Sequence, residues 1–287
     1  MDINLDDVKQ ITFPDGQTHI DLGYKIKSDH PVDIRCKIRS PEELFKLLML
    51  GNVLDANDVG SRLHIKYLMG ARMDRAIDQR QPFTLKLVCD MINNSFPNSP
   101  VTVFCPHSEA VSLLLKNYKE FLDSEKNFYY RVFERVILEN SLVKDYNAKS
   151  DTTYNTGSLS LIIPDAGAGK RWYNNFAGYF SSMLNKYEVS TVECSKKRDM
   201  QTGKLSSFVV PEQVNETCLI LDDLGDGLGT FVGLAKTLRE SGAKRVELAV
   251  CHGIFSKRLP VEGIDKIYTT TSYKNWESSD YLSVYRV

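Results

Sequence analysis

Apolar residues recur along the first half of this chain with two different spacings. They alternate with polar residues in Arg35–Ile38 and Arg62–Leu68, as in half-buried β-strands. They follow a helical spacing in Pro41–Val53, where a serine precedes the proline, and again in Thr84–Ile92. Val101–Phe104 is a short apolar run typical of a buried strand. The first half therefore predicts strands that alternate with helices.

The second half repeats this alternation. Its predicted strands are Leu159–Ile163, Cys218–Leu221 and Arg245–Val250. Its predicted helices are Arg171–Leu184 and Phe231–Ser241, the latter ended by a glycine. Because strands that alternate with helices are joined by crossover connections, both halves predict a mostly parallel sheet flanked by helices.

A polar segment separates the two halves. Lys144–Gly157 is rich in Asp, Asn, Ser and Thr and has no apolar period, so we interpret it as a loop or insertion near a domain boundary. We therefore expect an N-terminal domain over residues 1–143 and a C-terminal domain over residues 144–287.

Composition narrows the classes of protein that this chain can represent. A formal net charge of -1 gives no argument for a basic nucleic-acid-binding surface. Six cysteines stand singly, without a C-x-x-C pair, which favours reduced thiols over a disulfide framework or a zinc site. The acidic N-terminus lacks an apolar signal region, and no apolar run approaches the length of a membrane span. We expect a cytoplasmic protein without nucleic-acid or membrane partners.

The segment Cys218–Phe231 carries the clearest chemical signal. Its strand ends in Asp222 and Asp223, whose carboxylates could accept hydrogen bonds from ribose hydroxyls or support a magnesium ion. A glycine-bearing turn follows and leads into a helix, so backbone N–H groups and the helix N-terminus could face a phosphate. It lacks the Gly-Lys-Ser/Thr of a Walker loop, and two carboxylates precede the glycines, unlike in the dinucleotide fingerprint. The alternative is an acidic strand end followed by an ordinary turn.

This loop resembles the phosphoribosyl-pyrophosphate (PRPP) motif that phosphoribosyltransferases and PRPP synthetases share. Further segments resemble those of the PRPP synthetase (ribose-phosphate diphosphokinase) family in the family's order, over about residues 11–272. They are Phe13-Pro-Asp-Gly-Gln17, Ala71-Arg-Met-Asp-Arg75, Ile163-Pro-Asp-Ala-Gly-Ala-Gly-Lys-Arg171, Lys196-Lys-Arg198, Cys251–Ser256 and Ile267–Thr271. A phosphoribosyltransferase would have no reason to carry the first half of the chain.

The resemblance implies two tandem phosphoribosyltransferase-like domains, the first on the ATP side and the second with the ribose-phosphate loop. It implies catalytic roles for Lys196 and Arg198, and metal-linked positions at His107 and Asp165. The implied ATP-binding residues are Phe13, Asp15, Gln17, Arg72, Asp74, Arg75 and His107. The implied ribose-phosphate-binding residues are Asp222, Asp223, Asp226, Gly227, Leu228, Gly229 and Thr230. Taken alone, each of these features has an ordinary structural interpretation. Phe13 and Asp15 could form a turn, the charged residues at 72–75 could be a solvated cluster, and His107 could be a structural histidine.

Similar enzymes transfer the β,γ-diphosphate of ATP to the anomeric hydroxyl of ribose 5-phosphate, giving PRPP and AMP. The resemblance therefore implies ATP as co-substrate, Mg²⁺ as cofactor, and a role in nucleotide biosynthesis. Because the family's adenine site borrows the Phe-x-Asp-Gly segment from a neighbouring subunit, it also implies a homo-oligomer, at least a dimer.

Several departures from the family pattern leave the acceptor open. Gly227 stands where the family has a threonine hydroxyl for a terminal phosphate, and Leu228 where a small residue is typical. Cys105 replaces the Asp of Asp-x-His, and Gln17 replaces a Glu. A loop with fewer polar contacts and more space could admit ADP-ribose, giving ADP-ribose 1-pyrophosphate, as in divergent, often virus-borne members that act in NAD metabolism. Such a protein would work in the host cytoplasm. A catalytically silent regulatory homologue is a third alternative.

Overall fold

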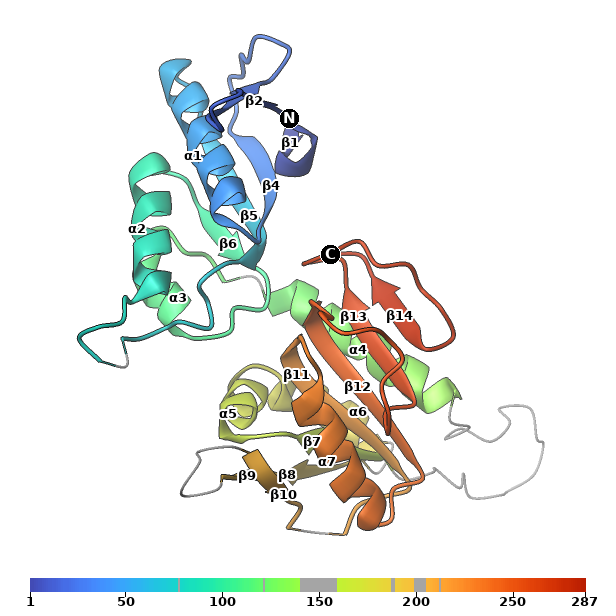
Figure 1. Ribbon diagram of the computed structural model, residues 1–287. Coiled ribbons are helices and arrows are strands. Elements are labelled where there is room, and N and C mark those ends of the chain that lie inside the picture. Colours follow the sequence, from blue (N-terminus) through green and yellow to red (C-terminus); the bar gives the residue numbers. More distant parts are fainter. Residues whose placement is uncertain (77, 121, 140–158, 187–188, 199–204, 212) are drawn as a thin grey trace, which may run out of the picture. The chain divides into compact units, whose positions relative to one another are not determined.

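The computed structural model describes residues 1–287 except 77, 121, 140–158, 187–188, 199–204 and 212 (Figure 1). The chain forms two compact units, Met1–Leu122 and Asp123–Val287, and each is described by itself. The expected domain boundary after residue 143 and the polar segment at 144–157 both lie outside the described residues. That boundary stays a prediction.

The first unit is built on a four-stranded parallel sheet with the order β1-β4-β5-β6. The strands are β1 (Asp2–Asn4), β4 (Val32–Ile38), β5 (Ser61–Leu68) and β6 (Val101–Val103). The helices are η1 (Leu5–Asp7), α1 (Pro41–Ala56), α2 (Thr84–Ser95) and α3 (Ala110–Leu114). An antiparallel hairpin of β2 (Lys9–Thr12) and β3 (Thr18–Asp21) forms a separate two-stranded sheet.

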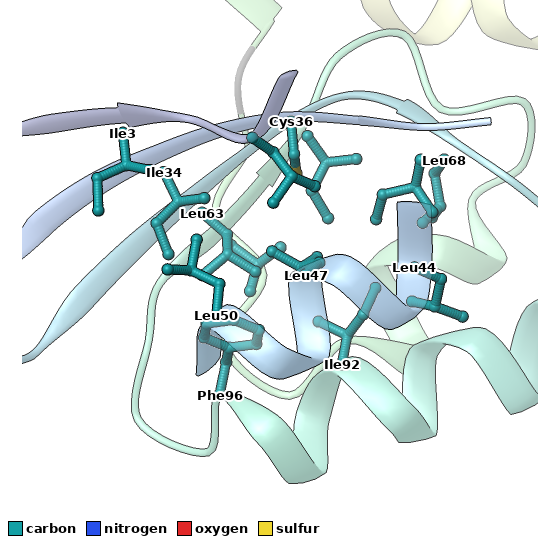
Figure 2. Close-up of a cluster of buried hydrophobic side chains, with 14 of the residues drawn as sticks. Ile3, Ile34, Cys36, Leu44, Leu47, Leu50, Leu63, Leu68, Ile92 and Phe96 are labelled. Atoms are coloured by element: carbon teal, nitrogen blue, oxygen red, sulfur yellow. The ribbon is translucent and has the colours of Figure 1, made fainter. Parts of the chain in front are cut away.

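The core of the first unit lies between this sheet and helices α1 and α2. Figure 2 shows Leu47 of α1, Ile92 of α2 and Leu63 of β5 among the buried side chains of this core. The helix α1 begins where the sequence predicts it, because Ser40 accepts a hydrogen bond from the Glu43 N–H at 3.3 Å and a proline occupies the first turn.

The second unit is built on a six-stranded parallel sheet with the order β14-β13-β12-β11-β7-β8. The strands are β7 (Leu159–Ile163), β8 (Val189–Glu193), β11 (Thr217–Gly225), β12 (Arg245–Gly253), β13 (Lys266–Thr270) and β14 (Leu282–Tyr285). The helices are α4 (Leu122–Glu139), α5 (Ala166–Asn175), α6 (Ala177–Lys186) and α7 (Gly229–Glu240). β9 (Ser195–Arg198) and β10 (Leu205–Val209) form an antiparallel pair.

Helices cover both faces of this sheet (Figure 1). On one face Phe231 and Leu238 of α7 join the buried cluster formed by Ile220 and Leu248. On the other, the Tyr129 hydroxyl of α4 donates to the Asp222 carbonyl oxygen of β11 at 3.1 Å. Both units thus confirm the predicted fold class, mostly parallel sheets flanked by helices.

The helices of the second unit differ from the prediction in two details. The single helix expected over Arg171–Leu184 is wrong: α5 begins earlier, at Ala166, and the chain breaks at Phe176 before α6 begins. The reason is that Asp165 caps α5, while Phe176 leaves helical geometry (φ -126°, ψ -36°). The helix α4 has no counterpart among the predicted elements. Within the described residues, no helix is both long enough and apolar enough to span a bilayer.

Candidate functional site

Two neighbouring carboxylates at the carboxyl end of β11 share one arginine. The Nη2 atom of Arg171, on α5, donates to the Oδ1 atoms of Asp222 and Asp223 at 2.8 Å each. The Asp223 side chain is 4% exposed, and those of Asp222 and Arg171 are 16% and 21% exposed. The shared arginine holds the two carboxylates close together, where they can act as one recognition element for a diol.

Burial raises the pKa of Asp222 well above the ordinary value of an aspartate, and the negative charge of Asp223 raises it further. Arg171 opposes both effects but does not cancel them. The Asp222 Oδ1 atom also accepts a hydrogen bond from the Asp223 N–H at 2.9 Å. The free site therefore holds a proton on Asp222 to a higher pH than an aspartate in water would, and a bound diol or cation would favour the charged form.

The loop after these carboxylates connects β11 to α7. Its Leu228 adopts a left-handed conformation with φ 56°, directly before the helix begins at Gly229. The first helical hydrogen bond runs from the Val232 N–H to the Leu228 carbonyl at 2.9 Å, and no side chain caps the helix. The N–H groups of the first turn thus remain available to an anion, and a helix N-terminus favours one.

Tight packing beneath the loop fixes its backbone. Leu228 is 4% exposed and belongs to the buried cluster on the α7 face of the sheet, so only its backbone can serve a ligand. The Gly225 carbonyl accepts hydrogen bonds from the N–H groups of Ile254 and Phe255 at 2.9 and 3.1 Å. A Cβ on Gly253 would lie 2.5 Å from the Phe255 ring, which only glycine avoids.

The outer side of the loop is open. A Cβ on Gly227 would meet nothing closer than Lys257 Cε at 3.8 Å and Ser256 Oγ at 4.0 Å. Both side chains belong to exposed residues in the segment after β12. The position that departs from the family pattern is thus a place where a ligand could approach the backbone.

Asp165 lies at the same edge of the sheet as the acidic pair, because it follows β7 and β7 pairs in parallel with β11. Its Oδ1 atom accepts hydrogen bonds from the N–H groups of Gly167 and Ala168 at 3.0 Å each. The described residues contain no group of three or more His, Cys, Asp or Glu side chains that could hold a metal ion. The metal-linked role of Asp165 stays a prediction.

Lys196 and Arg198 lie on β9, which pairs with β10 through Lys196↔Phe208 and Arg198↔Leu205. Their side chains are outside the described residues, as is the segment 199–204 that follows. The predicted catalytic roles of both residues are therefore untested.

The candidate ATP-binding residues of the first unit lie in two places. Phe13, Asp15 and Gln17 form the tip of the β2–β3 hairpin, where the Asp15 side chain accepts the Gln17 N–H at 3.0 Å. All three are exposed, Phe13 by 49%. The remaining residues, Arg72, Asp74, Arg75 and His107, follow the carboxyl ends of the neighbouring strands β5 and β6.

The residues that follow β5 and β6 differ in how far their side chains are exposed to solvent. The Arg75 side chain is 84% exposed and its Nε lies 3.9 Å from Asp74 Oδ1. His107 is half-buried. Cys105, in place of the family's Asp, is 4% exposed with φ 46°, so its thiol is turned into the protein.

Three contributors to the site were not among its predicted residues. Arg171 is the last residue of a matched segment, and no role is predicted for it. Tyr129 comes from the helix that was not predicted, and Lys257 directly follows the matched segment Cys251–Ser256. Only Arg171 carried a usable signal in the sequence, its place in the Pro-Asp-x-Gly-x-x-x-Arg pattern.

No protein-family model matches the chain. Among curated proteins it is 24% identical to ribose-phosphate pyrophosphokinase 4 of Saccharomyces cerevisiae over 258 residues, 88% of this chain and 71% of that protein. It is 27% identical to ribose-phosphate pyrophosphokinase of Aquifex aeolicus over 285 residues, 96% of this chain and 82% of that one. The structure of phosphoribosylpyrophosphate synthetase from Mycobacterium smegmatis matches 97% of this chain and 85% of its own, with a TM-score of 0.71 and 18% identity.

The solved structure shows that the fold of this chain is the two-unit α/β fold of a phosphoribosylpyrophosphate synthetase. The sequence relatives match the chain over 88% and 96% of its length. Over most of its length the chain is similar in sequence to ribose-phosphate pyrophosphokinases, the family that the ordered motifs predicted.

Proposed function

We propose that this protein is an ATP-dependent diphosphokinase that transfers the β,γ-diphosphate of ATP to the anomeric hydroxyl of a 5-phosphorylated ribose. Ribose 5-phosphate would give PRPP with release of AMP. The observation that supports this most is the carboxylate pair Asp222 and Asp223 beside a helix N-terminus at one sheet edge. Homology to ribose-phosphate pyrophosphokinases over most of the chain supports the same reaction.

In this proposal the acidic pair accepts hydrogen bonds from the 2- and 3-hydroxyls of the ribose. The N–H groups from Asp226 to Thr230 hold the 5′-phosphate, with the helix N-terminus of α7 behind them. The anomeric oxygen then attacks the β-phosphorus in line, the bond from this phosphorus to the bridging oxygen of the α-phosphate breaks so that AMP leaves, and the proton of the hydroxyl passes to solvent. Lys196 and Arg198 stabilise the charge on the transferring phosphoryl oxygens.

A magnesium ion fits the donor chemistry of the site, because carboxylate oxygens are its preferred protein ligands. We propose a link to magnesium for Asp165 in the second unit and for His107 in the first. One oxygen of Asp165 already caps α5, so phosphate oxygens and water would complete the coordination. When bound, the ion supplies positive charge to the diphosphoryl group.

A second acceptor, ADP-ribose, is favoured by one observation. The side of the loop at Gly227 is open, with the nearest atoms 3.8 Å or more from the position of a Cβ. A 5′-diphosphate that continues to an adenosine needs such an opening, whereas a terminal phosphate does not. ADP-ribose would then give ADP-ribose 1-pyrophosphate.

We further propose that the first unit binds ATP and that the protein acts as a homo-oligomer. The β2–β3 hairpin supports this, because it forms no part of the main sheet of its unit and carries an exposed Phe13 at its tip. An aromatic ring presented in this way can stack on a nucleotide base.

The test offers the protein ATP and Mg²⁺ with ribose 5-phosphate or ADP-ribose and determines product masses by mass spectrometry. We expect AMP together with an acceptor that has gained one diphosphate. The acceptor that gains it identifies the substrate. Gain on neither acceptor, with protein that is folded by circular dichroism, would refute the diphosphokinase activity.

Substitutions at the predicted catalytic residues separate the enzyme from a silent regulatory homologue. We expect Lys196→Ala and Arg198→Ala each to lower the rate of AMP formation by about 100-fold or more, since each removes charge stabilisation from the transition state. Lys236→Ala, an exposed lysine on α7, is the matched control and should retain wild-type rates. Equal AMP formation by all three variants would show that the proposed mechanism is wrong.

A further inference from the structure

A lysine outside the family motifs borders the open side of the phosphate loop. The Lys257 Cε atom lies 3.8 Å from the point that a Cβ on Gly227 would occupy, so its aliphatic stem runs beside the loop backbone. Lys257 is exposed, and among the described residues no ion pair or hydrogen bond engages its ammonium group. An ammonium group on such a stem can move over several ångströms to meet an anion.

A lysine ammonium group could offset negative charge around the loop. Two carboxylates, Asp222 and Asp223, lie just before the loop, and they share a single arginine, Arg171. A phosphorylated ribose brings at least one further negative charge to this place. The N–H groups at the start of α7 favour an anion, but their effect is that of a partial charge only.

Position 227 links these observations. A threonine at position 227 would offer a hydroxyl to the phosphate, and its branched side chain would also pack against Lys257. Glycine removes the hydroxyl and leaves room for the lysine stem and for Ser256 Oγ, which lies 4.0 Å from the Cβ position. The hydroxyl that glycine lacks at position 227 and the side chain of Lys257 would therefore lie on the same side of the loop.

We propose that Lys257 is a binding residue for the 5′-phosphoryl group of the acceptor and determines its affinity in place of a side chain at 227. This rests on the proposed function, since it assigns a residue to the same site. The shared chemistry is an anionic phosphoryl group on C5 of ribose, present in both ribose 5-phosphate and ADP-ribose.

Kinetics with full-length variants test the proposal. Lys257→Met keeps the stem but removes the charge, and a charge-assisted contact of this kind is worth about 10- to 100-fold in affinity. We expect the KM for the acceptor to rise by about that factor while the KM for ATP changes less than about twofold. Lys257→Arg should retain most of the affinity, and Lys236→Ala should behave as wild type.

A second substitution separates recognition from loop damage. Gly227→Ser restores a hydroxyl to the loop, and its Cβ would have only ordinary van der Waals contacts. In the Lys257→Met background we expect Gly227→Ser to recover part of the acceptor affinity. A loop that had merely been distorted by the loss of the lysine would gain nothing from it.

Running both acceptors distinguishes the sources of the phosphoryl group. The larger rise in KM identifies the acceptor whose phosphoryl group Lys257 contacts more strongly. An unchanged KM for both acceptors in Lys257→Met would overturn the proposal while leaving the diphosphokinase activity intact. If wild-type protein turns over neither acceptor, calorimetric titration with ribose 5-phosphate and ADP-ribose still tests Lys257, and equal binding by wild type and Lys257→Met overturns it.

Discussion

Replacing Asp222 by asparagine should stabilise the free protein while it impairs the site. Burial and the charge of Asp223 raise the pKa of Asp222, so the folded protein holds this proton to a higher pH than the unfolded chain does. Ionisation of the Asp222 carboxyl therefore lowers the free energy of unfolding. This loss grows as the pH rises from the unfolded pKa of about 3.9 towards the folded pKa of Asp222. An asparagine causes no such loss.

The size of the effect follows from the geometry. The two Oδ1 atoms both lie 2.8 Å from one Arg171 nitrogen, so they are no more than twice that distance apart. Two charges about 5 Å apart repel by about 3 kcal/mol at an effective dielectric constant of 20. Asparagine removes this repulsion and loses the charge assistance of one Arg171 hydrogen bond, about 1 kcal/mol. We expect a net gain of about 1–3 kcal/mol in the free energy of unfolding above about pH 7.

Thermal unfolding of the metal-free protein at a series of pH values measures this. The Tm of Asp222→Asn should exceed that of wild type by about 2–4 °C per kcal/mol near pH 8, and the difference should vanish near pH 4. The variant should also lose most of its affinity for the acceptor, because an amide is a weaker acceptor than a carboxylate. A lower Tm at pH 8, or a difference independent of pH, would refute the reasoning.

Asp33 provides a control with the opposite sign. Hydrogen bonds from Arg62 and His64 lower the pKa of Asp33, so its contribution to stability is present above the unfolded pKa and is lost as the pH falls. Because Arg62 is 49% exposed, we expect Asp33→Asn to cost only about 0.5–1 kcal/mol near pH 8. The Tm differences of the two variants should thus have opposite signs at pH 8; that of Asp222→Asn should shrink towards pH 4, whereas that of Asp33→Asn should persist there and shrink only at lower pH.

Two further predictions concern the loop support and the hairpin. Gly253→Ala should lower the free energy of unfolding by about 1–3 kcal/mol in chemical denaturation, because the new Cβ would lie 2.5 Å from the Phe255 ring and 2.7 Å from Thr269 Oγ1; Gly178→Ala, with no atom within 4 Å, is the control and should not destabilise. Phe13→Ala should leave the Tm unchanged, since Phe13 is 49% exposed, but should raise the KM for ATP about 10-fold or more. An unchanged KM for ATP would contradict the proposed contact of Phe13 with adenine. Wild-type protein that is monomeric by light scattering would show that no neighbouring subunit supplies it.

The central strands of both main sheets could be predicted from sequence because they are buried apolar runs, whereas β1, β8, β13 and β14 have no counterpart among the predicted strands. Leu159–Ile163 is apolar at four of its five positions, and the structure confirms it as β7 with the same bounds. The break at Phe176 could not be predicted, because Phe176 and Phe180 both suit a continuous apolar face. The helix α4 did carry a helical spacing at Phe128, Val132 and Val136, which the charged residues between them obscured.

The candidate site was predictable where chemistry follows a local pattern and not where it depends on tertiary contacts. The carboxylates Asp222 and Asp223 directly follow the apolar run Cys218–Leu221, so their place near the end of the strand that became β11 could be inferred. Their contact with Arg171 joins residues 51 and 52 positions apart, which no local pattern reveals. The inward direction of Leu228 depends on a left-handed backbone angle that sequence rarely predicts for leucine.

Leu228 and Gly227 divide the phosphate loop into two parts that can change independently. The leucine secures the loop to the core, and the residue before it faces an open side where a new side chain meets no close neighbour. If the proposed roles of the loop and of Lys257 hold, substitutions at 227 and at 257 would alter which phosphorylated sugar is accepted without a loss of folding stability. A lineage carrying this loop could change its substrate in single steps, each leaving a folded protein for selection to act upon.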